Sequence, residues 1–332
     1  MSGSVTWDAR WIGTHGIARH ATEVTRRLTG SYRHVKPGRV APTSPVDPIY
    51  LRSVLRLGAG DLFVTPGFNA ALPGRFRQLL TVHDLIHLRV ADETSRVKRA
   101  YYEGLVRPVI RSTRRVLTVS EFSRREIIDW SGLEPEDVVT VGNGSSIAAA
   151  TEDELDARSR AQKRTVLFVG NAKPHKNLDL LIAAVRHLPD DVRVVTVGVT
   201  PEHVARRCAE LGAARGRFDV MPGISDGELR RLYLGAACVA LPSTYEGFGL
   251  AALEGMATGT PTAYVCEAVD EVVGEQGFRC QSASDGEEFA TAVEQAMTLD
   301  RVARARLVQE SGKFSWAKAA ERVERQINEL ST

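Results

Sequence analysis

Short apolar runs rich in β-branched residues alternate with longer amphipathic segments along the whole chain. Parallel strands need long crossover connections, usually helical, so this alternation predicts an α/β fold built on parallel sheets. In the first half, the alternation predicts strands at 5–8, 61–65, 79–82 and 116–119, and helices at about 16–29, 95–111 and 121–131. Ser120 stands where the last helix needs an N-cap.

A second unit with the same rhythm begins near residue 165, where TVLFVG indicates a buried strand. The polar segment 151–164 has no β pattern and is expected to link the two units. A chain of 332 residues is long enough for two domains. We therefore expect two Rossmann-like, doubly wound domains facing a central cleft, where ligands of such sheets bind.

Composition narrows the class of protein. The apolar share of 43% and charged share of 25% are those of a globular protein, and no apolar run is long enough to span a membrane. The first residues show no signal-peptide pattern. The four cysteines lack CxxC spacing, so free thiols in a reducing compartment, by default the cytoplasm, are expected.

Charge is distributed unevenly. Residues 1–150 hold 21 Lys and Arg against 14 Asp and Glu, whereas the remainder holds 22 against 27. A basic first half suits an anionic partner. The alternative is a solvent-exposed surface that has a local excess of basic side chains. No nucleic-acid-binding motif accompanies the charge, so nucleic acid is not expected as a partner.

The stretch STYEGFGLAALEGMATGTP at 243–261 contains the strongest functional signal. A strand enters this turn, and a helix follows from about Gly249. Unpaired N–H groups and glycines at a helix start form a cradle for phosphate. Glu246 and Glu254 cannot bind phosphate, but carboxylates bind sugar hydroxyls well. Two acids flanking a phosphate cradle describe a site for a sugar nucleotide.

A dinucleotide-dependent dehydrogenase could share the two-domain outline. However, the chain has no GxGxxG at a strand-to-helix turn, and Gly142-Asn143-Gly144 lacks the third glycine. Hydride transfer is therefore not favoured.

EGFGLAALE resembles the E-x7-E signature of the retaining family-4 glycosyltransferases, which have the GT-B fold. DARWIGTHGIARH, TVHDLIHLR, TVSEFSRREI, LFVGNAKPHKNLDLLIAA and FSWAKAAERV are similar to further motifs of that family, in the same order. The resemblance implies an acceptor-side domain at 1–160, a donor-binding domain at 161–312, and a C-terminal helix at 313–332 that returns to the first domain.

The resemblance also assigns roles to residues of the second domain. Glu254 would bind the nucleotide ribose and Glu246 the donor sugar, with backbone amides of Phe248, Gly249 and Leu250 at the sugar or the diphosphate. Lys176 would neutralise the leaving diphosphate, a sensible electrostatic role. Asn171 is expected at the donor, at a position where many relatives have an arginine. Either Lys173 or His175 supplies a second positive charge in its place, or the site has only one. Residues of the base pocket would be Val220, Met221 and Gly223.

In the first domain, the resemblance places His83 at the donor sugar and Gly16 against the diphosphate. Relatives usually show Gly-Ile-Gly where this chain has Gly16-Ile17-Ala18, so only Gly16 is expected to approach the ligand closely. Asp84 either orients His83 or caps a helix.

The implied activity is hexosyl transfer with retention, from a nucleotide sugar to a hydroxyl acceptor such as a glycan, a lipid-linked sugar or a small molecule. Similarity to bacterial mannosyl and rhamnosyl transferases favours GDP-mannose or a deoxysugar donor. No DxD motif occurs, so neither a metal nor another cofactor is expected. Alternatives are a GT-B epimerase or phosphorylase, and a non-catalytic nucleotide-sugar-binding subunit.

The segment 96–115 combines many basic side chains with apolar residues at near-helical spacing, including Val97. We expect the apolar residues to face the domain core and the basic ones to lie outward. Such a helix suits peripheral contact with an anionic membrane, and an ordinary solvated helix is the alternative.

Overall fold

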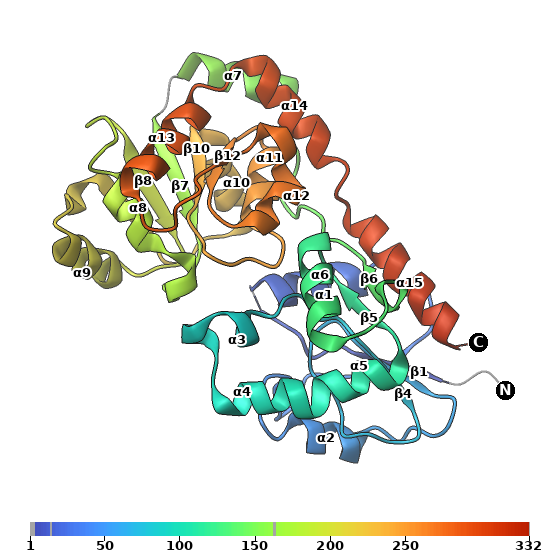
Figure 1. The fold of residues 1–332 in the computed structure, drawn as a ribbon. Coiled ribbons are helices and arrows are strands. Elements are labelled where there is room, and N and C mark those ends of the chain that lie inside the picture. Colours follow the sequence, from blue (N-terminus) through green and yellow to red (C-terminus); the bar gives the residue numbers. More distant parts are fainter. Residues whose placement is uncertain (1–3, 14, 162–163, 332) are drawn as a thin grey trace. The chain divides into compact units, whose positions relative to one another are not determined.

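The structure is a computed structural model that describes residues 4–13, 15–161 and 164–331, with the side chains of 158–161 excepted. The chain divides into two compact units, which are described separately below. Unit 1 comprises residues 1–144 and 314–332, and unit 2 comprises residues 145–313. Both units are α/β, and every strand pairing between the named strands is parallel (Figure 1).

Unit 1 is built on a four-stranded sheet in the order β2-β1-β3-β4 and a two-stranded sheet of β5 and β6. A single bridge between Thr81 and Leu117 joins the two sheets. The elements are β1 (Val5–Asp8), α1 (Gly16–Thr25), β2 (Arg33–Val35), α2 (Asp47–Val54), β3 (Leu62–Thr65), β4 (Arg77–Leu80), α3 (Ile86–Arg89), α4 (Arg96–Tyr101), α5 (Arg107–Thr113), β5 (Val116–Thr118), α6 (Glu121–Ser131), β6 (Val138–Thr140) and α15 (Trp316–Ser331).

Unit 2 is built on one six-stranded sheet in the order β12-β11-β10-β7-β8-β9. Its elements are α7 (Glu152–Ala161), β7 (Thr165–Val169), α8 (Leu178–Ala184), β8 (Arg193–Val197), α9 (Pro201–Leu211), β9 (Phe218–Met221), α10 (Asp226–Gly235), β10 (Cys238–Leu241), α11 (Leu250–Ala257), β11 (Thr262–Tyr264), α12 (Asp270–Val273), β12 (Phe278–Arg279), α13 (Gly286–Met297) and α14 (Arg301–Ser311). Helices α8, α9 and α13 pack on one face through a large aliphatic core. Tyr233 of α10 packs on the opposite face.

The C-terminal helix α15 belongs to unit 1, where it packs against α1. The Glu324 carboxylate accepts hydrogen bonds from the N–H groups of Thr29 and Gly30 at 3.0 and 2.6 Å, and from the Tyr32 hydroxyl at 2.9 Å. Arg115 of unit 1 forms an ion pair with Glu329 at 3.2 Å. Helix α15 is therefore held by polar contacts as well as by its buried apolar side.

The segment expected to link the units is different in the structure. Residues 152–161 form α7, which contacts α14 and α10 of unit 2, and the unit boundary lies at 144–145 instead of 160. Glu154 explains part of this difference, because its carboxylate accepts two hydrogen bonds of 2.8 Å from Arg230 of α10. The polar sequence of this segment does not by itself indicate a packed helix, because Arg230 lies 76 residues from Glu154.

The basic segment 96–115 is also less regular than expected. A π-helical stretch, Tyr102–Val106, separates α4 from α5, and Val97 is 68% exposed instead of facing the core. Ser120 does cap α6, since its hydroxyl accepts from the Ser123 N–H at 3.0 Å. None of the helices in the described part of the chain is long and apolar enough to cross a membrane. The four cysteines are free and buried.

Candidate active site

The carboxyl edge of the unit 2 sheet carries the predicted donor-binding loops. Strands β7 and β10 are neighbours at the centre of this sheet, with β8 and β9 on one side and β11 and β12 on the other. Strand order therefore reverses between β7 and β10, and open α/β sheets bind ligands at such a switch point. The loop after β7 carries Lys176, and the loop after β10 carries Glu246.

These two loops are joined directly. The Thr244 N–H donates to the His175 carbonyl at 2.8 Å, and Lys176 Nζ lies 2.7 Å from Glu246 Oε1. The Lys176 and Glu246 side chains are 20% and 14% exposed, so solvent screens their ion pair only in part. Two residues predicted for opposite parts of one ligand thus neutralise each other in this structure.

The N-terminus of α11 lies directly after this loop. Gly249 is its N-cap and has a φ of +96°, a left-handed conformation that favours glycine. A Cβ atom at Gly249 would also lie 3.1 Å from Val269 Cγ2. Phe248 is buried, and Leu250 is the first helical residue. The first N–H groups of a helix have no partner within it, so this turn can bind anionic or hydroxyl oxygens.

Glu254 lies inside α11 and is 5% exposed. Its Oε2 accepts a hydrogen bond of 2.9 Å from the hydroxyl of Tyr233 on α10. Helix α11 approaches β10 closely at the next residue, because a Cβ atom at Gly255 would lie 2.9 Å from Val239 Cγ2. This close packing accounts for the depth of Glu254. Nothing in the sequence indicated Tyr233 as its partner.

The predicted base-pocket residues lie at the end of β9 and after it. Val220 and Met221 point to opposite faces of the sheet, as successive strand residues do. Val220 packs against the core of α8, α9 and α13, whereas Met221 is on the face of Tyr233. Gly223 is exposed, and an added Cβ atom there would meet no heavy atom within 4 Å. Of the two side chains, only Met221 can serve a site on the Tyr233 face.

Asn171 occupies the position after the β7 loop glycine and is exposed. Its Oδ1 accepts from the Lys173 N–H at 3.1 Å, which closes a local turn. The side-chain oxygen of Asn171 therefore shapes the loop that carries Lys176.

In unit 1, His83 follows β4 and is buried. Its Nε2 lies 2.8 Å from the Pro66 carbonyl, which can only accept, so Nε2 carries the hydrogen. Burial, together with a smaller contribution from the neighbouring His20, lowers the pKa of His83 to about 3. His83 is therefore neutral at pH 7 and presents a lone pair at Nδ1, which can accept a hydrogen bond from a hydroxyl group.

A second buried histidine adjoins His83. The rings of His20 and His83 meet edge to face, with centroids 4.8 Å apart. His20 Nδ1 donates to Asn143 Oδ1 at 2.9 Å, and burial lowers the pKa of His20 to about 4. Nothing in the sequence connects His20 with Asn143, because 123 positions separate them.

Gly16 is the first residue of α1 and is exposed. The helix is capped by His15, whose side chain accepts from the Ala18 N–H at 3.3 Å. The His15 side chain therefore caps the start of α1. Asp84 lies before a different helix, α3. Its Oδ1 accepts from the Ile86 N–H at 3.0 Å, which supports the capping role instead of one in orienting His83.

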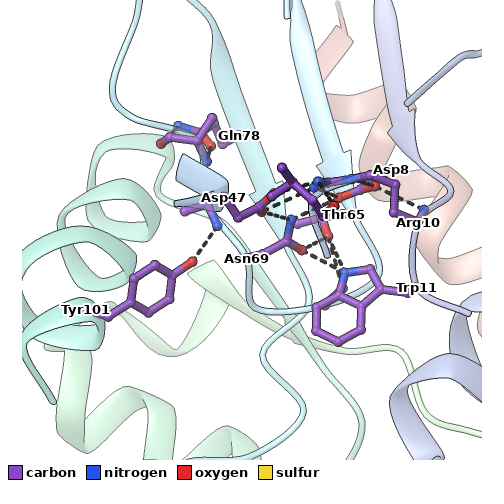
Figure 2. Close-up of polar contacts among 12 residues, drawn as sticks. Asp8, Arg10, Trp11, Asp47, Thr65, Asn69, Gln78 and Tyr101 are labelled. Atoms are coloured by element: carbon purple, nitrogen blue, oxygen red, sulfur yellow. Dashed lines mark hydrogen bonds and ion pairs between the residues drawn. The ribbon is translucent and has the colours of Figure 1, made fainter. Parts of the chain in front are cut away.

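A buried polar network lies at the carboxyl end of β1 (Figure 2). The Asp8 carboxylate accepts from Arg10 Nε at 2.8 Å and from Asn69 Nδ2 at 2.9 Å, and Asp47 forms a second ion pair with Arg10. Trp11 Nε1 donates to Asn69 Oδ1 at 2.7 Å. Burial alone lowers the pKa of Arg10, but hydrogen bonds to both carboxylates outweigh burial and raise it. This network ties β1 and the start of α2 together.

Among the described residues, no three His, Cys, Asp or Glu side chains are grouped so that they could hold a metal ion. The described residues at this sheet edge offer hydrogen bonding, the charge of Lys176 and the N-terminus of α11.

Parallel sheets in two Rossmann-like units, with paired acids on a strand–turn–helix, define the GT-B class of glycosyltransferases. Residues 14–148 match the model of Glycosyltransferase Family 4, and residues 151–314 match the model of Glycosyl transferases group 1. The chain belongs to the family-4 GT-B glycosyltransferases.

Named relatives agree with this membership. The O-antigen chain mannosyltransferase B of Escherichia coli is 28% identical over 273 residues, which cover 76% of this chain and 71% of that protein. The D-inositol 3-phosphate glycosyltransferase of Mycolicibacterium gilvum is 33% identical over 165 residues, which cover 46% of this chain but only 37% of that protein.

Solved structures show the same fold. The crystal structure of Anabaena HepE in complex with UDP and glucose has a TM-score of 0.70 at 15% identity, covering 98% of this chain and 99% of HepE. The sucrose-phosphate synthase of Thermosynechococcus elongatus has a TM-score of 0.73 at 16% identity, covering 99% of both chains.

Proposed function

We propose that this glycosyltransferase moves a hexose from a nucleotide sugar to a hydroxyl acceptor, with retention of anomeric configuration. The observation that supports this most is the pairing of Lys176 with Glu246 at the switch point of the unit 2 sheet, beside the N-terminus of α11. One cation and a helix N-terminus suit a diphosphate, and a neighbouring carboxylate suits a sugar hydroxyl.

Within this proposal, the Tyr233 hydroxyl orients the Glu254 carboxylate for the two ribose hydroxyl groups. Phe248, Gly249 and Leu250 offer backbone N–H groups to the sugar or the diphosphate. His83 accepts a hydrogen bond from the donor sugar through Nδ1, and Gly16 contacts the diphosphate. Gly223 and Met221 contribute to the base pocket, with Asn171 shaping the Lys176 loop.

Transfer would proceed by attack of the acceptor hydroxyl on the face from which the nucleoside diphosphate departs. The leaving phosphate takes the acceptor proton, so no protein base is required. Lys176 and the α11 N-terminus stabilise the charge that develops on the phosphate, as electrostatic stabilisation of a transition state requires. No step of this scheme needs a metal, and excess EDTA should leave the rate unchanged. Loss of activity that magnesium restores would contradict metal independence.

GDP-mannose is the donor we favour, with a deoxysugar nucleotide as second choice, because a matched relative is named as a mannosyltransferase. A glycan, a lipid-linked sugar or a small molecule is the acceptor class, and action on the cytoplasmic side of the membrane follows from the donor. Release of nucleoside diphosphate from a panel of nucleotide sugars tests the donor. The one-bond carbon–proton coupling at the anomeric carbon of the product tests retention, and an inverted product would refute it.

Reaction without an acceptor, or dependence on inorganic phosphate, would instead indicate an epimerase or a phosphorylase. Binding of nucleotide sugar without turnover for any acceptor would indicate a non-catalytic subunit.

A further inference from the structure

Cys266 is a buried thiol that contacts the turn holding Glu246. Strand β11 pairs in parallel with β10, so the segments that follow these two strands leave the same edge of the unit 2 sheet. Glu246 lies in the segment after β10, and Cys266 lies in the segment after β11, 20 residues further along the chain. The Glu246 backbone N–H donates to Cys266 Sγ at 3.2 Å, and Cys266 is 5% exposed. The Cys266 side chain is therefore part of the surroundings of the candidate active site.

The segment after β11 contacts the same turn at a second point. Residues Glu267–Val269 form a short 3-10 helix, and the Val269 N–H donates to the Cys266 carbonyl at 3.0 Å. Val269 is buried, and an added Cβ atom at Gly249 would lie 3.1 Å from its Cγ2. The sulfur of Cys266 is thus presented by an ordered segment that packs against the start of α11.

Contacts from the β7 side hold this turn as well. The Thr244 N–H donates to the His175 carbonyl at 2.8 Å, and the Glu246 carboxylate pairs with Lys176. A diphosphate that takes the Lys176 ammonium group would break this ion pair. The hydrogen bond from the Glu246 N–H to Cys266 does not involve Lys176, so it stays intact when the ion pair breaks.

The chemistry of a buried thiol suits such a contact. Burial raises the pKa of the Cys266 thiol to about 11, so the sulfur is uncharged at pH 7. A neutral thiol is a weak acceptor, but it adds no negative charge beside the Glu246 carboxylate or an incoming diphosphate. Without the sulfur, the partly buried Glu246 N–H would have no acceptor at this point, which is unfavourable enough to shift the backbone.

Other cysteines of unit 2 are used differently. The Cys238 thiol donates to the carbonyl of the next residue, Val239, at 3.2 Å. The Cys280 thiol donates to the Ser282 carbonyl at 3.1 Å. Neither of these contacts reaches a residue predicted to bind the donor, whereas the Cys266 contact does.

We propose that Cys266 is a positioning residue for the transfer reaction. Its sulfur fixes the Glu246 backbone while the Glu246 side chain leaves Lys176 and binds the hydroxyl groups of the donor sugar. This inference rests on the proposed role of Glu246 at the donor sugar, and it adds a residue from outside the E-x7-E stretch. Because small displacements of a positioned group lower the rate of a reaction strongly, the contact matters most for turnover.

Cys266→Ala tests the proposal in the full chain. The donor is whichever of GDP-mannose, UDP-glucose and dTDP-rhamnose the parent turns over. With saturating donor, kcat should fall about fivefold or more, because Glu246 is held less precisely. The Kd of the matching nucleoside diphosphate should stay within about twofold, because this ligand lacks the sugar. Cys266→Ser keeps an acceptor for the Glu246 N–H and should recover most of the lost rate.

Cys280→Ala is the matched control. Cys280 is also fully buried in unit 2, and its thiol contacts Ser282 instead of the Glu246 turn. Each alanine variant removes one buried sulfur atom, so urea denaturation should show comparable losses of stability. Only Cys266→Ala should lose turnover. An equal loss of kcat in both variants would indicate a general packing effect and would overturn the proposal.

Hydrogen exchange of the Glu246 amide measures the contact itself, without any substrate. Mass spectrometry with electron-transfer fragmentation resolves single amides within the peptide that covers 243–249. Exchange of the Glu246 amide at pH 7 should be faster in Cys266→Ala than in the parent, and unchanged in Cys280→Ala. Unchanged exchange in Cys266→Ala would show that the sulfur does not hold this N–H, and the proposal would then be wrong.

Glu246→Gln separates this inference from the proposed function. If Glu246→Gln lowers kcat and Cys266→Ala does not, Glu246 serves the donor without help from Cys266, and this inference alone fails. If Glu246→Gln leaves kcat unchanged, the proposed role of Glu246 fails, and this inference fails with it.

Discussion

Lys176 Nζ lies 2.7 Å from Glu246 Oε1, so the basic residue expected for the diphosphate and the acid expected for the sugar bind each other. A diphosphate arriving at this site must compete with a carboxylate for the same ammonium group. The pair therefore holds Lys176 in place before binding, and its rearrangement on binding would couple the phosphate and sugar parts of the donor.

Glu246→Gln should separate affinity from turnover. Loss of the carboxylate frees Lys176, so nucleoside diphosphate should bind as tightly as in the parent or more tightly. The rate with saturating donor should fall about tenfold or more, because hydrogen bonds to a charged group are worth roughly 1.5–3 kcal/mol. Titration calorimetry and steady-state kinetics measure the two quantities.

Lys176→Ala completes this comparison, because it leaves Glu246 unpaired beside the phosphates. We expect the double variant Lys176→Ala/Glu246→Gln to bind nucleoside diphosphate better than Lys176→Ala alone. Strictly additive effects would show that the two side chains act independently.

Tyr233→Phe should weaken donor binding by a smaller amount than Glu254→Gln. Removing the hydroxyl leaves the buried Glu254 carboxylate with one hydrogen bond fewer, at a typical penalty of about 1–3 kcal/mol. The variant should show an increased KM with kcat nearly unchanged, since ribose contacts are the same in ground and transition states. Tyr264→Phe, which loses a hydroxyl hydrogen bond to Asp270 in the same unit, is a matched control. A drop in kcat alone would remove Tyr233 from ribose positioning.

The stability of unit 1 should fall between pH 6.5 and pH 4. Burial lowers the pKa of His20 to about 4 and that of His83 to about 3, below the ordinary value of 6.5. The unfolded chain therefore binds more protons than the folded chain in this range, and stability is complete above pH 6.5 and lost as the pH falls. At pH 5 the loss is on the order of 2 kcal/mol for His20 alone.

Hydrogen exchange of α1 amides in the full chain, compared at pH 7 and pH 5 after correction for intrinsic rates, measures this loss. His20→Gln should reduce the pH dependence, whereas His34→Gln, an exposed histidine of the same unit, should not. An unchanged pH dependence in His20→Gln would show that other groups control acid unfolding.

Arg10→Met should destabilise unit 1 by about 3–5 kcal/mol. Asp8 and Asp47 are both buried and share Arg10, so its loss leaves two carboxylates without their cation. Burial already raises the pKa of Asp47, and the variant should be rescued in part at low pH, where the acids become protonated. Arg33→Met removes an exposed arginine and should change the unfolding free energy by less than about 0.5 kcal/mol. Urea denaturation measures both.

The sequence by itself determined the α/β class, the second unit with its strands and helices from residue 165, and the turn that holds Glu246 and Glu254. These features are local: strand and helix periods, a Ser120 cap and a glycine at a left-handed turn are all encoded within a few neighbouring residues. The predicted domain boundary at 160 differs from the observed one at 144–145, and the reason is not local. Helix α7 is polar, and Arg230 stabilises it from a distant part of the chain.

Only the tertiary structure decided which side chains meet. Lys176 and Glu246 are 70 residues apart, and they pair because β7 and β10 are adjacent in a sheet whose order does not follow the sequence. The same reason applies to Tyr233 with Glu254 and to His20 with Asn143, whose partners come from different elements. Burial also sets the charge state of His20 and His83, because it lowers the pKa of both and keeps them neutral. Neither the pairing of these side chains nor their burial can be read from composition or spacing.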